Sequence, residues 1–115
     1  MKKALSGIFG AGVIALWLIS NNSTVTTVAA ATGNAEKGKE VFEQCSACHN
    51  VENDEKKMGP SLKGLYKRDK LKNGKKVTDS TVKAMIDAGG NGMPAYADML
   101  SDQEKADVIA YLHTI

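Results

Sequence analysis

The most reactive side chains of the 115-residue chain stand together: two residues separate Cys45 from Cys48, and His49 follows directly. Two thiols at this spacing can each add to one vinyl group of a haem and form two thioether bonds. The histidine after the second thiol then reaches the iron as its proximal ligand. The chain contains only these two cysteines. The pattern therefore predicts one covalently attached haem of the c type.

Two other interpretations of these residues stay open at this point. A thioredoxin-like Cys-x-x-Cys pair would require a βαβ pattern, and the chain shows no convincing strand-like alternation. A zinc site could be counted from Cys45, Cys48, His49 and His113. However, the adjacent Cys48 and His49 rarely both reach one tetrahedral metal. The haem interpretation is the stronger one.

A haem held by protein on both faces needs a second axial ligand, for which Met93 is the strongest candidate. It lies in the run Asn-Gly-Met-Pro at 91–94, outside any helical pattern. The proline keeps the methionine on extended backbone, and the glycine lets the loop approach the porphyrin closely. Met85, on the apolar face of a predicted helix, is expected to fill the core. The alternatives are Met58, Met99, His113 and an open coordination site.

Four short helices joined by glycine-bearing loops are expected to position these residues, which gives an all-α fold. The helices are predicted from Asn34 to about Gln44, from Leu62 to Tyr66, from a cap at Asp79 or Ser80 to Gly89-Gly90, and from Ser101 to the C-terminus. Asn34 is expected to cap the first helix, and Ser101 with Glu104 forms a capping box at the last. Glycine after the third helix suits a left-handed C-cap.

Helical periodicity also predicts which side chains are buried. The expected apolar faces are Val41, Phe42 and Cys45; Val82, Met85 and Ile86; and Val108, Ile109, Leu112 and Ile115. Met99 is expected to pack beside the start of the last helix. Gly38 lies inside the first helix, where glycine costs about 1 kcal/mol relative to alanine. Its presence there predicts close approach of another backbone.

The first 31 residues are predicted to be a signal peptide. Lys2 and Lys3 precede an uncharged, largely apolar run at 4–19, and small residues at 29–31 offer a cleavage site. The apolar run is shorter than the about 20 residues that span a bilayer, so cleavage is favoured over a retained membrane anchor. Either outcome predicts an exported domain at 32–115 that is periplasmic or otherwise extracytoplasmic.

Removal of Lys2 and Lys3 leaves 13 of the 15 basic side chains against 13 acidic ones. This near-neutral balance gives no support for nucleic-acid binding. Basic residues nevertheless crowd one stretch, as a solvated loop or as a docking patch for an acidic partner. They are Lys63, Lys67, Arg68, Lys70, Lys72, Lys75 and Lys76. Because so small a domain has a marginal core, the haem is expected to complete it.

Residues 34–115 resemble the small class I cytochromes c, in particular a short bacterial monohaem member. The resemblance is carried by Gly38-x-x-x-Phe42, Cys45-x-x-Cys48-His49, Gly59-Pro60-x-Leu62-x-Gly64-Leu65, Met93-Pro94-Ala95-Tyr96 and Leu100-Ser101…Tyr111-Leu112. The order and spacing of these pieces are more specific than the haem motif alone. Mitochondrial-type members use a tryptophan at the haem propionates, and this chain has no tryptophan after residue 31.

The resemblance implies roles for individual residues. It implies that the first and last helices cross, with Gly38 and Phe42 against Tyr111. It implies that the carbonyl of Pro60 accepts a hydrogen bond from the proximal His49, and that Arg68 lies near a haem propionate.

The function expected from these observations is single-electron transfer in an exported respiratory or oxidative chain, without enzymatic turnover. The iron would cycle between Fe(II) and Fe(III) with His49 and Met93 as ligands. The alternative is a haem subunit of an oxidoreductase, or a gas-binding or peroxidase-like cytochrome with a labile distal methionine. The expected partners are a redox donor and an acceptor: a dehydrogenase, reductase or terminal oxidase. Membrane contact is expected only if the N-terminal segment is retained.

Overall fold

The computed structural model describes residues 32–115, so the predicted signal peptide at 1–31 lies outside the described residues. The described chain forms α1 (Ala35–Phe42), the 3₁₀ helix η1 (Leu65–Lys67), α2 (Asp79–Ala88) and α3 (Asp102–Leu112). Within it, β-structure is limited to two isolated bridges. The predicted all-α fold is confirmed. None of the helices between residues 32 and 115 is long and apolar enough to cross a membrane.

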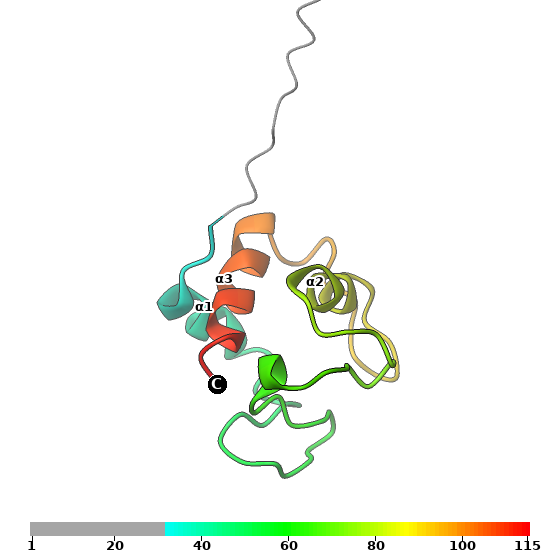
Figure 1. The fold of residues 1–115 in the computed structure, drawn as a ribbon. Helices are drawn as coiled ribbons and strands as arrows, with labels where there is room; N and C mark the ends of the chain where they lie inside the picture. The colour runs from blue at the N-terminus through cyan, green and yellow to red at the C-terminus, as the bar shows by residue number, and fades with distance from the viewer. Residues whose placement is uncertain (1–31) are drawn as a thin grey trace, which may run out of the picture.

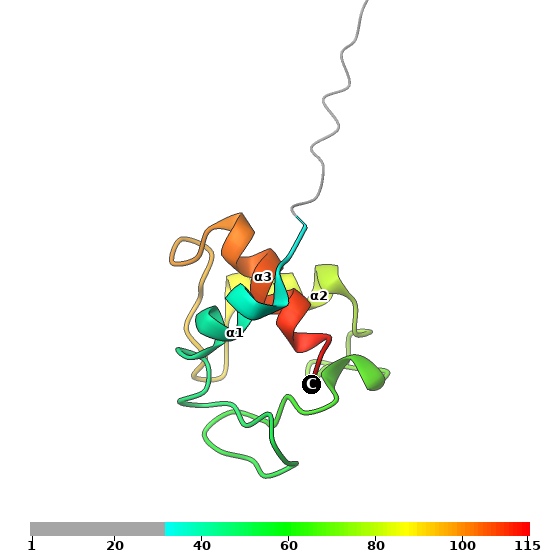
Figure 2. The same cartoon turned by 90° about the vertical axis from the view of Figure 1, so that its left-hand side faces the viewer.

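The first and last helices, α1 and α3, lie across each other in both views (Figures 1 and 2). A Cβ at Gly38 would overlap the backbone carbonyl of Asp107, so only glycine allows the two helices to approach this closely. Beside this contact the rings of Phe42 and Tyr111 have centroids 5.3 Å apart. The close backbone approach predicted from Gly38 is therefore present, and the helix-interior glycine serves packing.

The caps at the starts of α1 and α3 agree with prediction, whereas the cap of α2 does not. Asn34 accepts a hydrogen bond from the backbone N–H of Lys37, and Ser101 forms the expected capping box. The cap of α2 is Thr78, one residue before the predicted Asp79 or Ser80. Its extended backbone frees the hydroxyl to accept from the N–H of Thr81, 3.1 Å away. A threonine can replace the acidic partner of a capping box, because its hydroxyl also reaches back to the cap N–H.

The first helix also ends earlier than predicted, at Phe42 rather than Gln44. The chain continues in tight turns over 43–48, in which the N–H groups of Cys45 and Ser46 both bond to the Phe42 carbonyl. These turns lead directly into the Cys-x-x-Cys-His segment.

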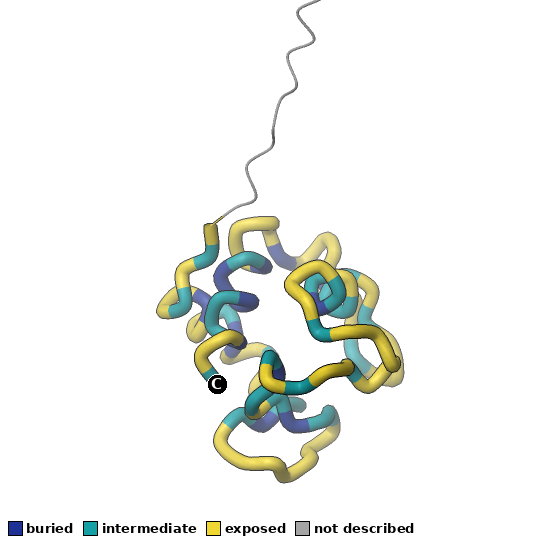
Figure 3. The backbone as a smooth tube through the Cα atoms, viewed as in Figure 1, coloured by how far each residue is buried: buried dark blue, intermediate teal, exposed yellow. Residues whose placement is uncertain are grey.

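The core gathers where α1, η1, α2 and α3 face one another (Figure 3). Its buried members are Phe42, Leu65, Val82, Val108, Ile109 and Leu112. The predicted Met85, Ile86 and Ile115 are partly buried. The expectation for Met99 is wrong, because its side chain is 63% exposed. Leu100, directly before the cap residue Ser101, is buried in place of Met99. A hydrophobic side chain at this position normally packs back onto the first turn of the helix.

A buried carboxylate on α3 fixes the start of the described chain, a feature the sequence analysis missed. Asp107 is 3% exposed and accepts hydrogen bonds at 2.8 Å from the backbone N–H of Asn34 and from the Gln103 amide. Gln103 also donates to the carbonyl of Thr32. Residues 32–34 are thus held on α3 before α1 begins.

Asp107→Asn is expected to destabilise the fold in a pH-dependent way. The bond from the Asn34 N–H, and then that from Gln103, lowers the pKa of Asp107 below its ordinary value. A carboxyl with a lowered folded-state pKa stabilises the fold above its unfolded pKa, and this contribution is lost as pH falls through the folded pKa. The variant should therefore have a lower Tm than the wild type at pH 7, with a smaller difference below about pH 4. Thermal unfolding by circular dichroism at both pH values measures this. A difference that is the same at both would contradict it.

Candidate functional site

The Cys-x-x-Cys-His segment follows the end of α1 in a continuous set of turns. The N–H groups of Cys48 and His49 both bond to the carbonyl of Cys45, at 3.1 and 2.9 Å. The two thiols are not joined in a disulfide. Burial, and secondly the nearby Cys48, raises the pKa of the Cys45 thiol. Both thiols are thus available, and the turn presents them from one short stretch of backbone.

The ring of His49 is held in one orientation by the Gly-Pro turn at 59–60. Its Nδ1 lies 2.8 Å from the carbonyl oxygen of Pro60, which as an acceptor requires the proton to be on Nδ1. The turn sits flat against the imidazole, since a Cβ at Gly59 would lie 2.6 Å from the ring Cε1. The Gly59 N–H bonds to the carbonyl of Cys48 and closes this arrangement. The other ring nitrogen, Nε2, therefore keeps a lone pair for a metal.

Met93 is placed by a two-residue hairpin turn. Gly90 and Met93 exchange backbone hydrogen bonds of 2.9 and 3.0 Å, and the two residues between them, Asn91 and Gly92, both have positive φ. This is the geometry of a type I′ turn, for which Asn-Gly is the preferred pair. The sequence analysis placed Met93 in a loop but missed this signal. The turn gives the methionine a defined backbone position instead of a flexible one.

His49 and Met93 both line one apolar pocket. Its walls come from all three α-helices and from the loops before and after α2: Phe42, Cys45, His49, Leu62, Ile86, Met93, Tyr96, Leu100, Val108 and Leu112. Of these residues, only Cys45, His49 and Met93 were predicted from the sequence as site residues. Burial raises the pKa of the Tyr96 hydroxyl, so this side chain stays neutral.

The donors around this pocket fit a c-type haem. They comprise two free thiols, an imidazole held through Nδ1 by the Pro60 carbonyl, and a thioether sulfur, surrounded by apolar side chains. An imidazole nitrogen and a methionine sulfur are the axial donors typical of cytochromes c. The apolar walls suit a flat, largely apolar macrocycle.

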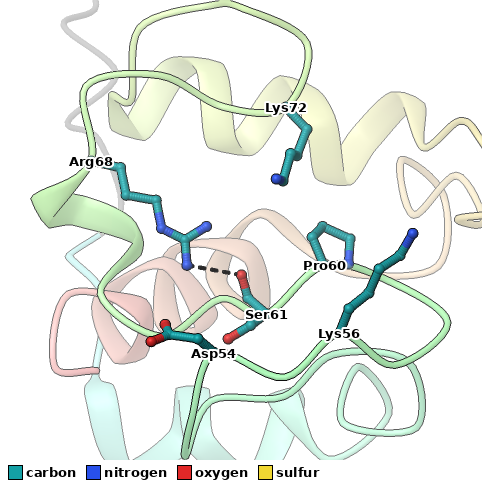
Figure 4. A pocket seen from close by; sticks show the side chains of 6 residues that line it. All are labelled: Asp54, Lys56, Pro60, Ser61, Arg68 and Lys72. Carbon is teal, nitrogen blue, oxygen red and sulfur yellow. Dashed lines mark hydrogen bonds between the residues drawn. The ribbon is translucent and has the colours of Figure 1, made fainter.

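A second, larger cleft of about 560 Å³ is polar and borders the same Gly-Pro turn (Figure 4). It is lined by Asp54, Lys56, Pro60, Ser61, Arg68 and Lys72. Arg68 donates to the carbonyls of Ser61 at 3.0 Å and Lys63 at 2.6 Å. This cleft offers no sulfur or imidazole donor, so its larger size does not make it the iron site. The basic side chains that line this cleft are suited to bind carboxylate groups.

The other candidate ligands lie outside the apolar pocket. Met58 is 84% exposed and Met99 is 63% exposed. His113 stacks on Tyr66 and its Nε2 lies 2.8 Å from a carboxylate oxygen of Asp79. Its position does not bring it to the two cysteines. Between residues 32 and 115 no three His, Cys, Asp or Glu side chains are grouped to hold a metal ion, which speaks against the zinc alternative.

Comparison with known proteins agrees with this geometry. The family model of cytochrome c matches residues 35–115. Cytochrome c6 of Diacronema lutheri is 31% identical over 81 residues, which are 70% of this chain and 94% of that protein.

Solved structures show the same relationship. Cytochrome c6 of the diatom Phaeodactylum tricornutum matches with a TM-score of 0.56 and 29% identity, covering 71% of this chain and 93% of that one. Cytochrome cH of Methylobacterium extorquens matches with a TM-score of 0.52 and 25% identity, covering 72% and 100%. The chain therefore belongs to the cytochrome c family, as a small class I c-type cytochrome that carries one covalent haem c and transfers electrons without being an enzyme.

Proposed function

We propose that this cytochrome carries single electrons between redox proteins outside the cytoplasm, with Cys45 and Cys48 as the thioether residues and His49 and Met93 as the axial ligands. The observation that carries the proposal is that His49 and Met93 line the same apolar pocket, while the Pro60 carbonyl holds the histidine by its other nitrogen. The bound haem would supply a one-electron couple between Fe(II) and Fe(III).

The residues of the chain would favour electron transfer over bond chemistry in three ways. Pro60 fixes the imidazole tautomer and orientation of His49. The type I′ turn holds Met93 on fixed backbone, which limits rearrangement between oxidation states. The apolar walls exclude water, so the additional ferric charge is poorly solvated and the ferrous state is favoured. With two protein ligands in place, no coordination position remains for a substrate.

The N-terminal segment supports a proposal about location, and the role of electron carrier supports one about partners. The basic, apolar and small-residue segments at 2–3, 4–19 and 29–31 support export through a signal peptide at 1–31, with a retained anchor as the alternative. A dehydrogenase or reductase would donate electrons, and a further reductase or terminal oxidase would accept them. We also propose that Arg68, with its guanidinium at the polar cleft beside Pro60, faces a haem propionate.

Covalent attachment and a closed iron site are expected in the purified exported protein. Because thioethers survive acid, acidified acetone should leave the haem with the polypeptide, and pyridine should then give a haem c spectrum. Carbon monoxide should leave the spectrum of the ferrous protein unchanged at neutral pH. Cys45→Ser and Cys48→Ser should each retain one thioether, and the double variant should release its haem into acetone.

The matched control is Ser46→Ala, between the two cysteines, which should keep the haem in acidified acetone. A colourless protein, or haem extracted from the wild type, would contradict covalent attachment at this motif. A ferrous spectrum that shifts under carbon monoxide would instead favour the gas-binding or peroxidase-like alternative, with a labile distal methionine.

A further inference from the structure

The buried lysine of α3 lies where α2, the Met93 loop and α3 meet. Lys105 is 4% exposed, although lysine is rarely buried unless it is paired. Its Nζ is 2.7 Å from a carboxylate oxygen of Asp87, at the end of α2, and donates to the carbonyl of Ala97 at 2.9 Å. One ammonium thus binds the chain before and after the loop that contains Met93.

The two bonded segments form the stem of this loop. The N–H of Tyr96 bonds to the carbonyl of Ile86 at 2.9 Å, and the N–H of Ala97 to the carbonyl of Asp87 at 3.3 Å. Residues 89–95 therefore leave α2 and return to its last turn. We call residues 89–95 the distal loop.

Within the distal loop the backbone is already fixed. The type I′ turn joins Met93 to Gly90, and a Cβ at Gly89 would overlap the carbonyl oxygen of Met93. Since the loop is held internally, the position of Met93 relative to His49 depends on how the stem is attached to the rest of the protein. Lys105 makes that attachment to α3, the helix that packs on α1 and thus on the His49 side of the pocket.

The charges at the stem agree with an ion pair between Lys105 and Asp87. Hydrogen bonding to Lys105 first, and to Lys83 second, lowers the pKa of Asp87. Lys83 lies 2.9 Å from the second oxygen of Asp87 but is 43% exposed and belongs to α2 itself. Its contact with α3 is a longer ion pair of 3.8 Å with Asp102, whose side chain is 85% exposed. Exposed pairs of this kind contribute little, whereas the buried Lys105 contacts both sides of the stem from α3.

We propose that Lys105 is a positioning residue for the distal ligand: by binding both sides of the stem, it keeps the sulfur of Met93 at the iron. This inference rests on the proposed ligation by His49 and Met93. Removing the ammonium leaves the carboxylate of Asp87 and the carbonyl of Ala97 without their common donor, and the stem is then free to shift.

Displacement of methionine by imidazole in the ferric holoprotein measures this positioning. Imidazole can bind the iron only after the sulfur leaves, so its binding rate reports how often the distal loop opens. Lys105→Met, which keeps the length of the side chain, is expected to accelerate binding about tenfold, the effect of weakening the closed loop by about 1.4 kcal/mol. Asp87→Asn, which keeps a polar oxygen acceptor beside Lys105 Nζ, is expected to accelerate it by a smaller factor.

Two matched controls separate positioning from charge and from overall stability. Lys83→Met removes the other cation on Asp87 and should leave the rate within about twofold of wild type. Asp107→Asn removes a buried charged group two residues along α3, which bonds to Asn34 near the start of the described residues and not to the stem. It should lower the Tm yet leave imidazole binding unchanged.

The outcomes are distinguishable. The proposed ligation is wrong if the wild-type ferric protein shows no methionine–iron charge-transfer band, or if the band persists in Met93→Ala. The role of Lys105 then fails with it. If the band is present but Lys105→Met and Asp87→Asn bind imidazole at the wild-type rate, the ligation stands and the positioning role is wrong. Equal acceleration in Asp107→Asn would show that Lys105 contributes only general stability.

Discussion

Met93→Ala is expected to abolish the methionine–iron charge-transfer band of the ferric protein and to lower its reduction potential. Alanine has no donor atom, so the position opposite His49 is left to water or to added ligands. Loss of the sulfur removes the preference for Fe(II), which should lower the potential by on the order of 0.1 V within the ~0.8 V range that axial ligands span. Optical spectroscopy and a potentiometric titration measure the two effects.

Matched methionine variants test whether the effect belongs to position 93. Met58→Ala and Met99→Ala remove exposed thioethers, and Met85→Ala removes a partly buried one on α2. All three should keep the charge-transfer band, although Met85→Ala should lower stability by about 2 kcal/mol or more because it leaves a cavity. An unchanged band in Met93→Ala, or its loss in one of the other three, would assign the ligand elsewhere.

Gly38→Ala is expected to destabilise the protein, although alanine normally stabilises a helix interior by about 1 kcal/mol relative to glycine. The added Cβ would overlap the carbonyl of Asp107, and a backbone atom cannot move aside as a flexible side chain can. The α1–α3 crossing must then open, at a net cost of about 2–4 kcal/mol. Denaturant unfolding of the holoprotein, followed by circular dichroism, gives the free energy of unfolding.

The neighbouring exposed position supplies the control for Gly38. Lys39→Ala introduces the same residue into the same helix but away from α3, and its effect should be within about 0.5 kcal/mol of zero. A stabilised Gly38→Ala would mean that the helices do not cross as closely as they do here. In that case glycine at this position would have no packing role.

Sequence reasoning predicted those features that depend on residues close together in the chain. The Cys-x-x-Cys-His motif, the caps at Asn34 and Ser101 and the apolar faces of the helices are all local patterns. The cap at Thr78 was also local, but Asp79 and Ser80 directly after it are favourable cap residues too and were predicted in its place. The Asn-Gly turn before Met93 is also a local pattern, but its two residues were interpreted only as a loop.

The other features that were missed depend on contacts between distant residues. Asp107 bonds to Asn34, 73 positions away, and nothing in its neighbourhood distinguishes it from an exposed acid of a helix. Lys105 likewise looks like a surface lysine, because its buried environment is built by α2 and by the loop after it. Because charged side chains are usually exposed, a charged residue in a helical sequence is predicted to face solvent. This prediction is wrong whenever the charge is buried and paired.

The residues that line the apolar pocket are spread along the sequence from Phe42 to Leu112, and this constrains the order in which the pocket can form. A chain that emerges N-terminus first exposes its two thiols while the residues of α3 are still absent. At that stage neither the crossing of α1 with α3 nor the junction at Lys105 can exist. The attachment segment is therefore not yet covered by the last helix at that stage, and the pocket can close only after α3 has emerged.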